Sequence, residues 1–200
     1  MRLLHSICND KKINKMVTKN NNYVFKALDA YPYELENCVE ALNYALSYNE
    51  NDEMALSLMG RVYAEILTNY EEGIICYKLV LAENINNLEV QPHYINALLW
   101  NENYKEAEEF IKYALTVKGS DKAMLYLKKA NLYEHKKEYS KAIDVLKLAH
   151  INAFNNEFIE YLKSEKERIK TKSFIKDDSV KEKETEVTNK KTKRKFGFLF

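Results

Sequence analysis

The sequence predicts an all-α protein built as a stack of antiparallel helical hairpins. Three stretches resemble one another, and they begin at Tyr70, Tyr104 and Tyr139, with spacings of 34 and 35 residues. In each stretch a small residue follows three positions later: Gly73, Ala107 and Ala142. A self-similar period of this length is typical of stacked repeats. The chain also has only 2 Pro and 4 Gly, so it has few of the turn residues that a sandwich or barrel requires.

The charge is unevenly distributed. Residues 171–200 hold nine Lys/Arg and five Asp/Glu, a net charge of +4, whereas the chain as a whole carries only +1. Residues 1–170 therefore carry a net charge of −3. A body of this charge argues against broad nucleic-acid binding, which requires many cations that face phosphates.

The cysteines and the apolar segments favour a soluble cytoplasmic protein. Cys8, Cys38 and Cys76 are odd in number and widely spaced, which does not suit a disulfide framework. The N-terminus has too short an apolar run for a signal peptide, and no run of apolar residues is long enough to span a membrane.

The first part of the chain predicts a flexible N-terminus followed by half a repeat. Residues 1–22 are polar, and Met16 is an alternative start. Residues 23–31 suit one turn of helix, and Pro32 suits the first position of a new helix. Apolar residues then recur at three- and four-residue steps over 33–48, which predicts an amphipathic helix. We expect this helix to be the second half of a degenerate first repeat.

Three hairpins and a cap follow. The predicted helices cover about 52–68 and 70–83, 88–101 and 104–118, and 120–136 and 139–151. Gly60 lies inside the first of these helices, where we expect a neighbouring helix to approach closely. A last helix over about 155–170 has one apolar and one charged side, as the end of a repeat array requires. The repeat domain is therefore expected over 23–170, and a disordered tail over 171–200.

These residues resemble the tetratricopeptide repeat (TPR) family, whose unit is a helix–turn–helix of about 34 residues. The match covers 52–156 and is clearest in the second helices. It is poorest at Gln91, Tyr94, Ile95 and Leu98, because isoleucine stands there in place of the small residue. The resemblance implies a right-handed superhelical stack. A related family with 35-residue units reads RNA, and it is the alternative for the repeats.

The resemblance also implies a concave groove lined mainly by the first helix of each hairpin. Two sets of residues with a 35-residue spacing lie on that face: Arg61, Asn96 and Asn131, and one turn later Glu65, Trp100 and His135. Asparagine can bond to a peptide backbone as donor and acceptor, and tryptophan is enriched at binding hot spots. Ordinary solvated positions are the alternative. Ser57, Pro92 and Leu127 stand where some family members carry lysines that clamp a carboxylate, so we do not expect that clamp.

No catalytic or metal motif is present in the sequence, and we expect neither an enzyme nor a cofactor. The chain has no glycine-rich phosphate loop, no paired-cysteine motif and no nucleophile elbow. His93, His135 and His150 do not share a ligand spacing. The carboxylates are interpreted as solvated charges on helix surfaces.

The C-terminus ends in KKTKRKFGFLF, which places cations directly before Phe196, Phe198, Leu199 and Phe200. Four alternatives are open for this tip: docking on a partner protein, contact with an anionic membrane, folding back into the chain's own groove, or no function. The leading hypothesis is a scaffold or adaptor that binds a peptide or helix of another protein, with the tail as a second contact. The alternative is an RNA- or ribosome-associated accessory protein that uses the basic tail.

Overall fold

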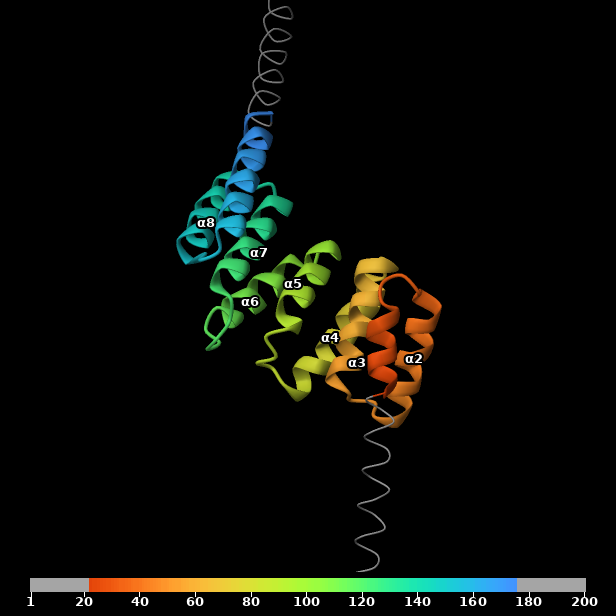
Figure 1. Ribbon diagram of the computed structural model, residues 1–200. Coiled ribbons are helices and arrows are strands. Elements are labelled where there is room, and N and C mark those ends of the chain that lie inside the picture. The colour runs from red at the N-terminus through yellow and green to blue at the C-terminus, as the bar shows by residue number, and fades with distance from the viewer. Residues whose placement is uncertain (1–21, 176–200) are drawn as a thin grey trace, which may run out of the picture. The chain divides into compact units, whose positions relative to one another are not determined.

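The computed structural model describes residues 22–175, which form helices and turns and contain no strand (Figure 1). The expected all-α fold is confirmed. The chain divides into two compact units between Ser120 and Asp121. The single repeat domain over 23–170 stays a prediction. No helix within 22–175 is long and apolar enough to cross a membrane. The predictions for Met16 and for Phe196, Phe198, Leu199 and Phe200 lie outside the described residues.

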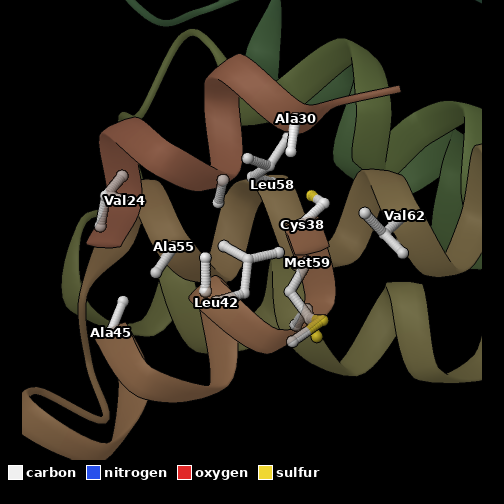
Figure 2. Packing of buried hydrophobic residues seen from close by; sticks show 12 residues of the cluster. Val24, Ala30, Cys38, Leu42, Ala45, Ala55, Leu58, Met59 and Val62 are labelled. Carbon is white, nitrogen blue, oxygen red and sulfur yellow. The ribbon is translucent and has the colours of Figure 1, made fainter. Parts of the chain in front are cut away.

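The first unit begins with a complete hairpin, so the prediction of a half repeat was wrong. Residues 22–30 form a helix, and α2 follows at Leu35–Tyr48. Val24, Ala27 and Ala30 are buried in a core shared with α2 and α3 (Figure 2). Pro32 does not begin α2 but lies in the turn before it, where a fixed φ near −65° also fits.

The second hairpin contains the expected pair of helices and one feature that the sequence did not predict. The Asp52 carboxylate accepts the Ala55 N–H (2.8 Å) and caps α3, Glu53–Arg61. The helix then widens into a π-helical segment, η1, at Val62–Ile66. The partner helix α4 covers Tyr70–Glu83. Single π-turns inside helices are frequent at functional sites.

The third hairpin of the first unit pairs α5 at Val90–Trp100 with α6 at Tyr104–Ala114, and each of these helices has 11 residues. Pro92 lies in the first turn of α5, as predicted. Ile95 is fully buried at the position that corresponds to Gly60. The contact between α5 and α6 is less extensive than that between α3 and α4, which is consistent with the larger side chain.

The second unit contains α7 at Lys122–His135, α8 at Tyr139–Asn152 and a helix over 156–175. Ala130, Leu146, Leu162 and Ile169 are buried together and join all three helices in one core. Leu162 and Ile169 thus supply the apolar side of the last helix, whose position as a cap was expected.

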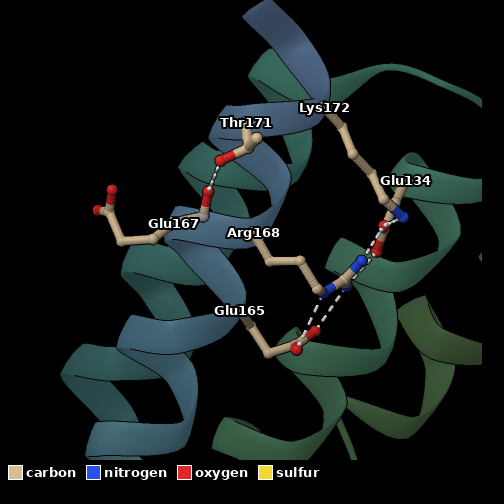
Figure 3. Close-up of polar contacts among 6 residues, drawn as sticks. All are labelled: Glu134, Glu165, Glu167, Arg168, Thr171 and Lys172. Carbon is tan, nitrogen blue, oxygen red and sulfur yellow. Dashed lines mark hydrogen bonds and ion pairs between the residues drawn. The ribbon is translucent and has the colours of Figure 1, made fainter. Parts of the chain in front are cut away.

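An ion-pair cluster holds the last helix on α7 (Figure 3). Glu134 accepts hydrogen bonds from Arg168 (2.5 and 2.7 Å) and from Lys172 (2.6 Å). The helix continues to at least residue 175, beyond its predicted end at 170. The bond from Lys172 to Glu134 fixes this additional part of the helix on α7. The interpretation of the carboxylates as solvated charges was wrong here, since the Glu134 side chain is only 13% exposed.

The connections within the α3–α4, α5–α6 and α7–α8 hairpins each use one residue in the left-handed region. These residues are Thr68 (φ 53°), Glu102 (φ 59°) and Lys137 (φ 58°), and each lies two residues before the tyrosine that begins the next helix. The N–H groups of Asn103 and Glu138 bond to carbonyls five residues earlier, at Leu98 and Tyr133 (both 2.8 Å). This pattern satisfies the last carbonyls of a helix and is usually completed by glycine.

Gly60 and Gly73 mark a close approach of α4 to α3 and η1. A Cβ atom on Gly60 would stand 2.5 Å from the ring of Tyr77, and one on Gly73 would stand 2.8 Å from the Ala64 Cβ. Tyr77 is fully buried, so its ring cannot move aside. The expectation that Gly60 marks a close helix contact is confirmed.

We expect Gly60→Ala to lower the free energy of unfolding by about 1–3 kcal/mol, because overpacking outweighs the higher helix propensity of alanine. Urea unfolding followed by circular dichroism measures this loss. In a Tyr77→Leu background the loss should be smaller, since the ring that causes the clash is absent. An equal loss in both backgrounds would contradict the assignment.

Glu102→Gly should raise the free energy of unfolding by about 1 kcal/mol, because it removes the strain of a left-handed residue that carries a Cβ atom. Asn101→Gly is the matched control, since Asn101 is right-handed (φ −84°) and gains nothing from glycine. Thermal unfolding of both variants tests the prediction. A stabilising effect of both, or of neither, would count against it.

Candidate partner-binding site

A polar network centred on Glu65 joins three parts of the first unit. Glu65 lies in η1, and its Oε2 accepts a hydrogen bond from the Tyr31 hydroxyl (3.0 Å). The Arg61 Nε lies 3.4 Å from the same oxygen. The His93 Nδ1, on α5, lies 2.7 Å from Oε1. The Arg61 guanidinium also covers the Tyr31 ring at 4.6 Å, so each member of the network has at least one fixed partner.

The Glu65 carboxyl group is ionised more easily than a free glutamic acid. Burial acts to raise its pKa, but the hydrogen bonds from His93 and Tyr31 and the positive charges of His93 and Arg61 outweigh that effect and lower it. Burial, together with the bond to the Glu65 carboxylate, raises the pKa of Tyr31. The network therefore presents a fixed carboxylate, with a side chain 23% exposed, beside an aromatic hydroxyl.

Tyr77 supports this network from the core. Its ring stacks on the His93 ring at a centroid distance of 6.4 Å and contacts Tyr94 edge to face at the same distance. Tyr94 in turn donates its hydroxyl hydrogen bond to Glu106 (2.6 Å). The orientation of the His93 ring is thus fixed on one side by a buried ring and on the other by the Glu65 carboxylate.

Two predicted groove residues continue along α5 beyond His93. Asn96 is half-buried, and its side chain makes no hydrogen bond to another residue within 22–175. Trp100 is 39% exposed, and its ring lies 5.7 Å from that of Tyr70. Residues three and seven positions after His93 lie on the same side of a helix. The structure therefore joins Arg61 and Glu65 directly and connects them through His93 to the helix that carries Asn96 and Trp100.

The other two predicted residues belong to the second unit. Asn131 and His135 lie one turn apart on α7, where Asn131 is half-buried and His135 is exposed. They occupy on α7 the repeat positions that Asn96 and Trp100 occupy on α5.

Sequence reasoning missed Tyr31 and His93. Tyr31 had a detectable signal, because it lies 34 residues before Glu65 and so occupies the same repeat position. Arg168 lies at the same spacing from Glu134. Recurrence at this spacing between residues of complementary chemistry thus marks contacts between neighbouring repeats. His93 had no such signal, since the period relates it to no polar residue of the network.

The described residues contain no group of three or more His, Cys, Asp or Glu side chains arranged to hold a metal ion. The first unit thus offers hydrogen-bonding groups in fixed positions and, two turns further along α5, a partly exposed indole ring. Such a combination suits recognition of a polypeptide, in which backbone amides and apolar side chains alternate.

Neither a family model nor a curated protein sequence matches this chain. Solved structures do match its fold. MamA from Desulfovibrio magneticus RS-1 is 18% identical with a TM-score of 0.59, over 76% of this chain and 88% of that one. A thermophilic TPR protein from Thermus thermophilus is 19% identical with a TM-score of 0.58, over 72% of this chain and 80% of that one.

The fold is TPR-like. A double mutant of MamA RS-1 matches to the same degree, with 17% identity and a TM-score of 0.58 over 76% of this chain and 88% of that one. The resemblance predicted from Tyr70, Tyr104 and Tyr139 is thereby confirmed for the fold. In this TPR-like arrangement, α3, α5 and α7 are the first helices of their hairpins.

Glu65→Gln should lower the free energy of unfolding at pH 7 by about 1–2 kcal/mol, because an ionised acceptor of three groups is lost. A carboxyl group with a lowered pKa in the folded state stabilises the protein above its unfolded pKa of about 4.3, and this contribution disappears as the pH falls. The difference between the variant and the wild type should therefore shrink below about pH 4.

Urea unfolding at neutral, mildly acidic and strongly acidic pH measures this difference. Glu71→Gln is the control, because Glu71 is exposed and makes no ion pair with a residue in 22–175. A difference that stays constant through the acid range would contradict the role given to Glu65.

Proposed function

We propose that this protein is a non-enzymatic scaffold or adaptor of the cytoplasm, which binds a peptide or helical segment of another protein. The binding face in the first unit consists of the exposed sides of the end of α3, of η1 and of α5. Arg61, Glu65, Asn96 and Trp100 are its contact residues. Asn131 and His135 have the same role on α7 of the second unit.

The observation that carries the proposal is the row His93, Asn96 and Trp100 on α5. At one end His93 is fixed by Glu65 and Tyr77, and at the other end the Trp100 indole is exposed on Tyr70. Between them, the Asn96 amide has hydrogen-bonding capacity that no residue within 22–175 uses. Half-buried polar groups are usually satisfied, and a bound peptide backbone offers both a donor and an acceptor.

The fixed network favours binding because it lowers the entropy that association removes. Arg61, Glu65 and His93 are held by one another before any partner arrives, so their side chains lose little freedom on binding. Trp100 supplies apolar area at low entropic cost, as aromatic anchors do at hot spots. The partner best suited to this face therefore has an apolar side chain for Trp100 and an extended or helical backbone beside Asn96.

The roles of the tail as a second contact and as an RNA-binding segment stay predictions. A salt titration of RNA binding, with the intact chain and with a chain that lacks residues 188–200, distinguishes the RNA-binding role of the tail from its role as a second protein contact. A steep salt dependence that is lost on truncation would favour the RNA-associated alternative.

The binding face is tested with peptides selected from a random library against the whole chain. Asn96→Ala combined with Trp100→Ala should weaken binding of the selected peptides by at least about tenfold at a temperature at which circular dichroism shows the variant to be folded, because a hot-spot residue contributes about 2 kcal/mol or more. Asn131→Ala tests the second unit in the same way.

The matched control is Ile75→Ala combined with Leu79→Ala, two exposed apolar residues on α4. This variant should bind the selected peptides as the wild type does. If the control weakens binding as strongly as the α5 variant, or if the α5 variant binds normally, the face is misassigned.

A further inference from the structure

A second surface of the first unit has a different chemistry. Two adjoining hollows of about 520 and 660 Å³ lie along α2, one of them between α2 and the helix over 22–30. They share Glu40 and Tyr44. We call them together the α2 groove. It lies within the first hairpin and is separate from the residues that bind Glu65.

Four carboxylates line the α2 groove: Asp29, Glu34, Glu36 and Glu40. All four are exposed, and none forms an ion pair with a cation in residues 22–175. Glu34 accepts one neutral hydrogen bond, from the Asn37 amide (2.7 Å). Lys26 is the one cation among the lining residues of the two hollows, and it lies over the Tyr23 ring at 5.4 Å.

Some acids elsewhere in the described chain are paired, whereas others, such as Glu71, are exposed without an ion pair to a residue in 22–175. Glu65, Glu106, Glu134 and Glu138 each have a positively charged partner in the structure. The α2 groove thus concentrates negative charge without a counter-charge of its own, and like charges on one surface favour a cationic ligand.

The floor of the α2 groove is apolar and aromatic. Leu35 and Val39 line it and are half-buried. The Tyr23 ring stacks on Tyr44 at 5.1 Å and on Tyr48 at 5.9 Å, and Tyr44 is 48% exposed. A ligand for this surface therefore needs cations for the rim and flat or branched apolar groups for the floor.

We propose that the C-terminal tip of the same chain, residues 190–200, docks in the α2 groove. The tip carries Lys190, Lys191, Lys193, Arg194 and Lys195 and no acid, and its final residues include Phe196, Phe198, Leu199 and Phe200. Cations for the rim and aromatic rings for the floor are thus joined within eleven residues of sequence.

The N-terminal segment 1–21 fits less well. It has five Lys/Arg and one Asp, but it contains no Phe, Tyr or Trp to stack on Tyr23 and Tyr44. The tip of a second copy has the same chemistry, and the effect of dilution distinguishes it from the tip of the same chain. The inference does not depend on the proposed partner-binding face.

The first test uses trypsin, because the cations of the tip are themselves cleavage sites. In the full-length protein, cleavage at residues 190–195 should be at least about tenfold slower than in a free peptide of residues 186–200, since docking removes the sites from the protease. Asp29→Lys combined with Glu40→Lys should restore fast cleavage. Glu102→Lys combined with Glu109→Lys, two exposed acids outside the α2 groove, should leave the protection unchanged.

The second test asks whether the tip competes for the groove. A full-length variant without aromatic rings at the tip should leave the α2 groove free, because it has lost the groups that fit the floor. This variant carries Phe196→Ser, Phe198→Ser and Phe200→Ser. A labelled peptide of residues 190–200 should then bind this variant at least about tenfold more tightly than it binds the wild type, whose own tip competes for the groove. Adding Asp29→Lys and Glu40→Lys to the variant should abolish that binding.

Several results would overturn the proposal. Cleavage of the wild-type tip as fast as that of the free peptide would show that the tip is not docked. Protection that disappears on dilution would assign the groove to the tip of a second copy. Protection of Lys11–Lys19 that the groove variant removes would assign it to the N-terminal segment.

Discussion

The contact between the backbone of α3 and the ring of Tyr77 is the constraint on which the first unit depends. Gly60 and Gly73 let the two helices approach until no Cβ fits between them, and the Tyr77 ring fills the remaining space. The same ring then lies against His93, so the geometry of the core determines where the imidazole points. The Glu65 network is thus positioned by packing first and by charge second.

The described acidic side chains differ in whether the fold uses their charge. Glu65 and Glu134 are half-buried and bind side chains from helices far away in sequence, which makes them part of the architecture. Asp29, Glu36 and Glu40 are exposed without such partners within 22–175. A partly buried carboxylate without a counter-charge would be costly, whereas an exposed one is tolerated and is available for binding. Exposure and pairing together therefore separate structural acids from candidate recognition acids better than sequence position does.

Local sequence predicted most of the helices, because the period of 34 and 35 residues records which side chains must nest. The second-helix pattern shows this well, since Gly73 leaves room for Ala64 and the Tyr77 ring fills the space that Gly60 leaves open. The sequence did not predict the helix over 22–30, the π-turn at Val62–Ile66 or the ring contact of His93. These features arise from packing between helices that the periodicity does not encode. Within the candidate site, Arg61 and Glu65 were predicted and do touch, but their partners Tyr31 and His93 emerged only from the three-dimensional arrangement.

The ion pairs of Glu134 also fix the C-terminal part of the last described helix. Arg168 and Lys172 both bind this carboxylate, so the helix is held on α7 to within one turn of residue 175. If the helix ended at residue 170, Lys172 would lie outside it, and Arg168 would be the one cation of this helix bound to Glu134. Loss of the charge of a single partly buried carboxylate in the second unit would thus release a segment that lies 34 to 38 residues further along the chain.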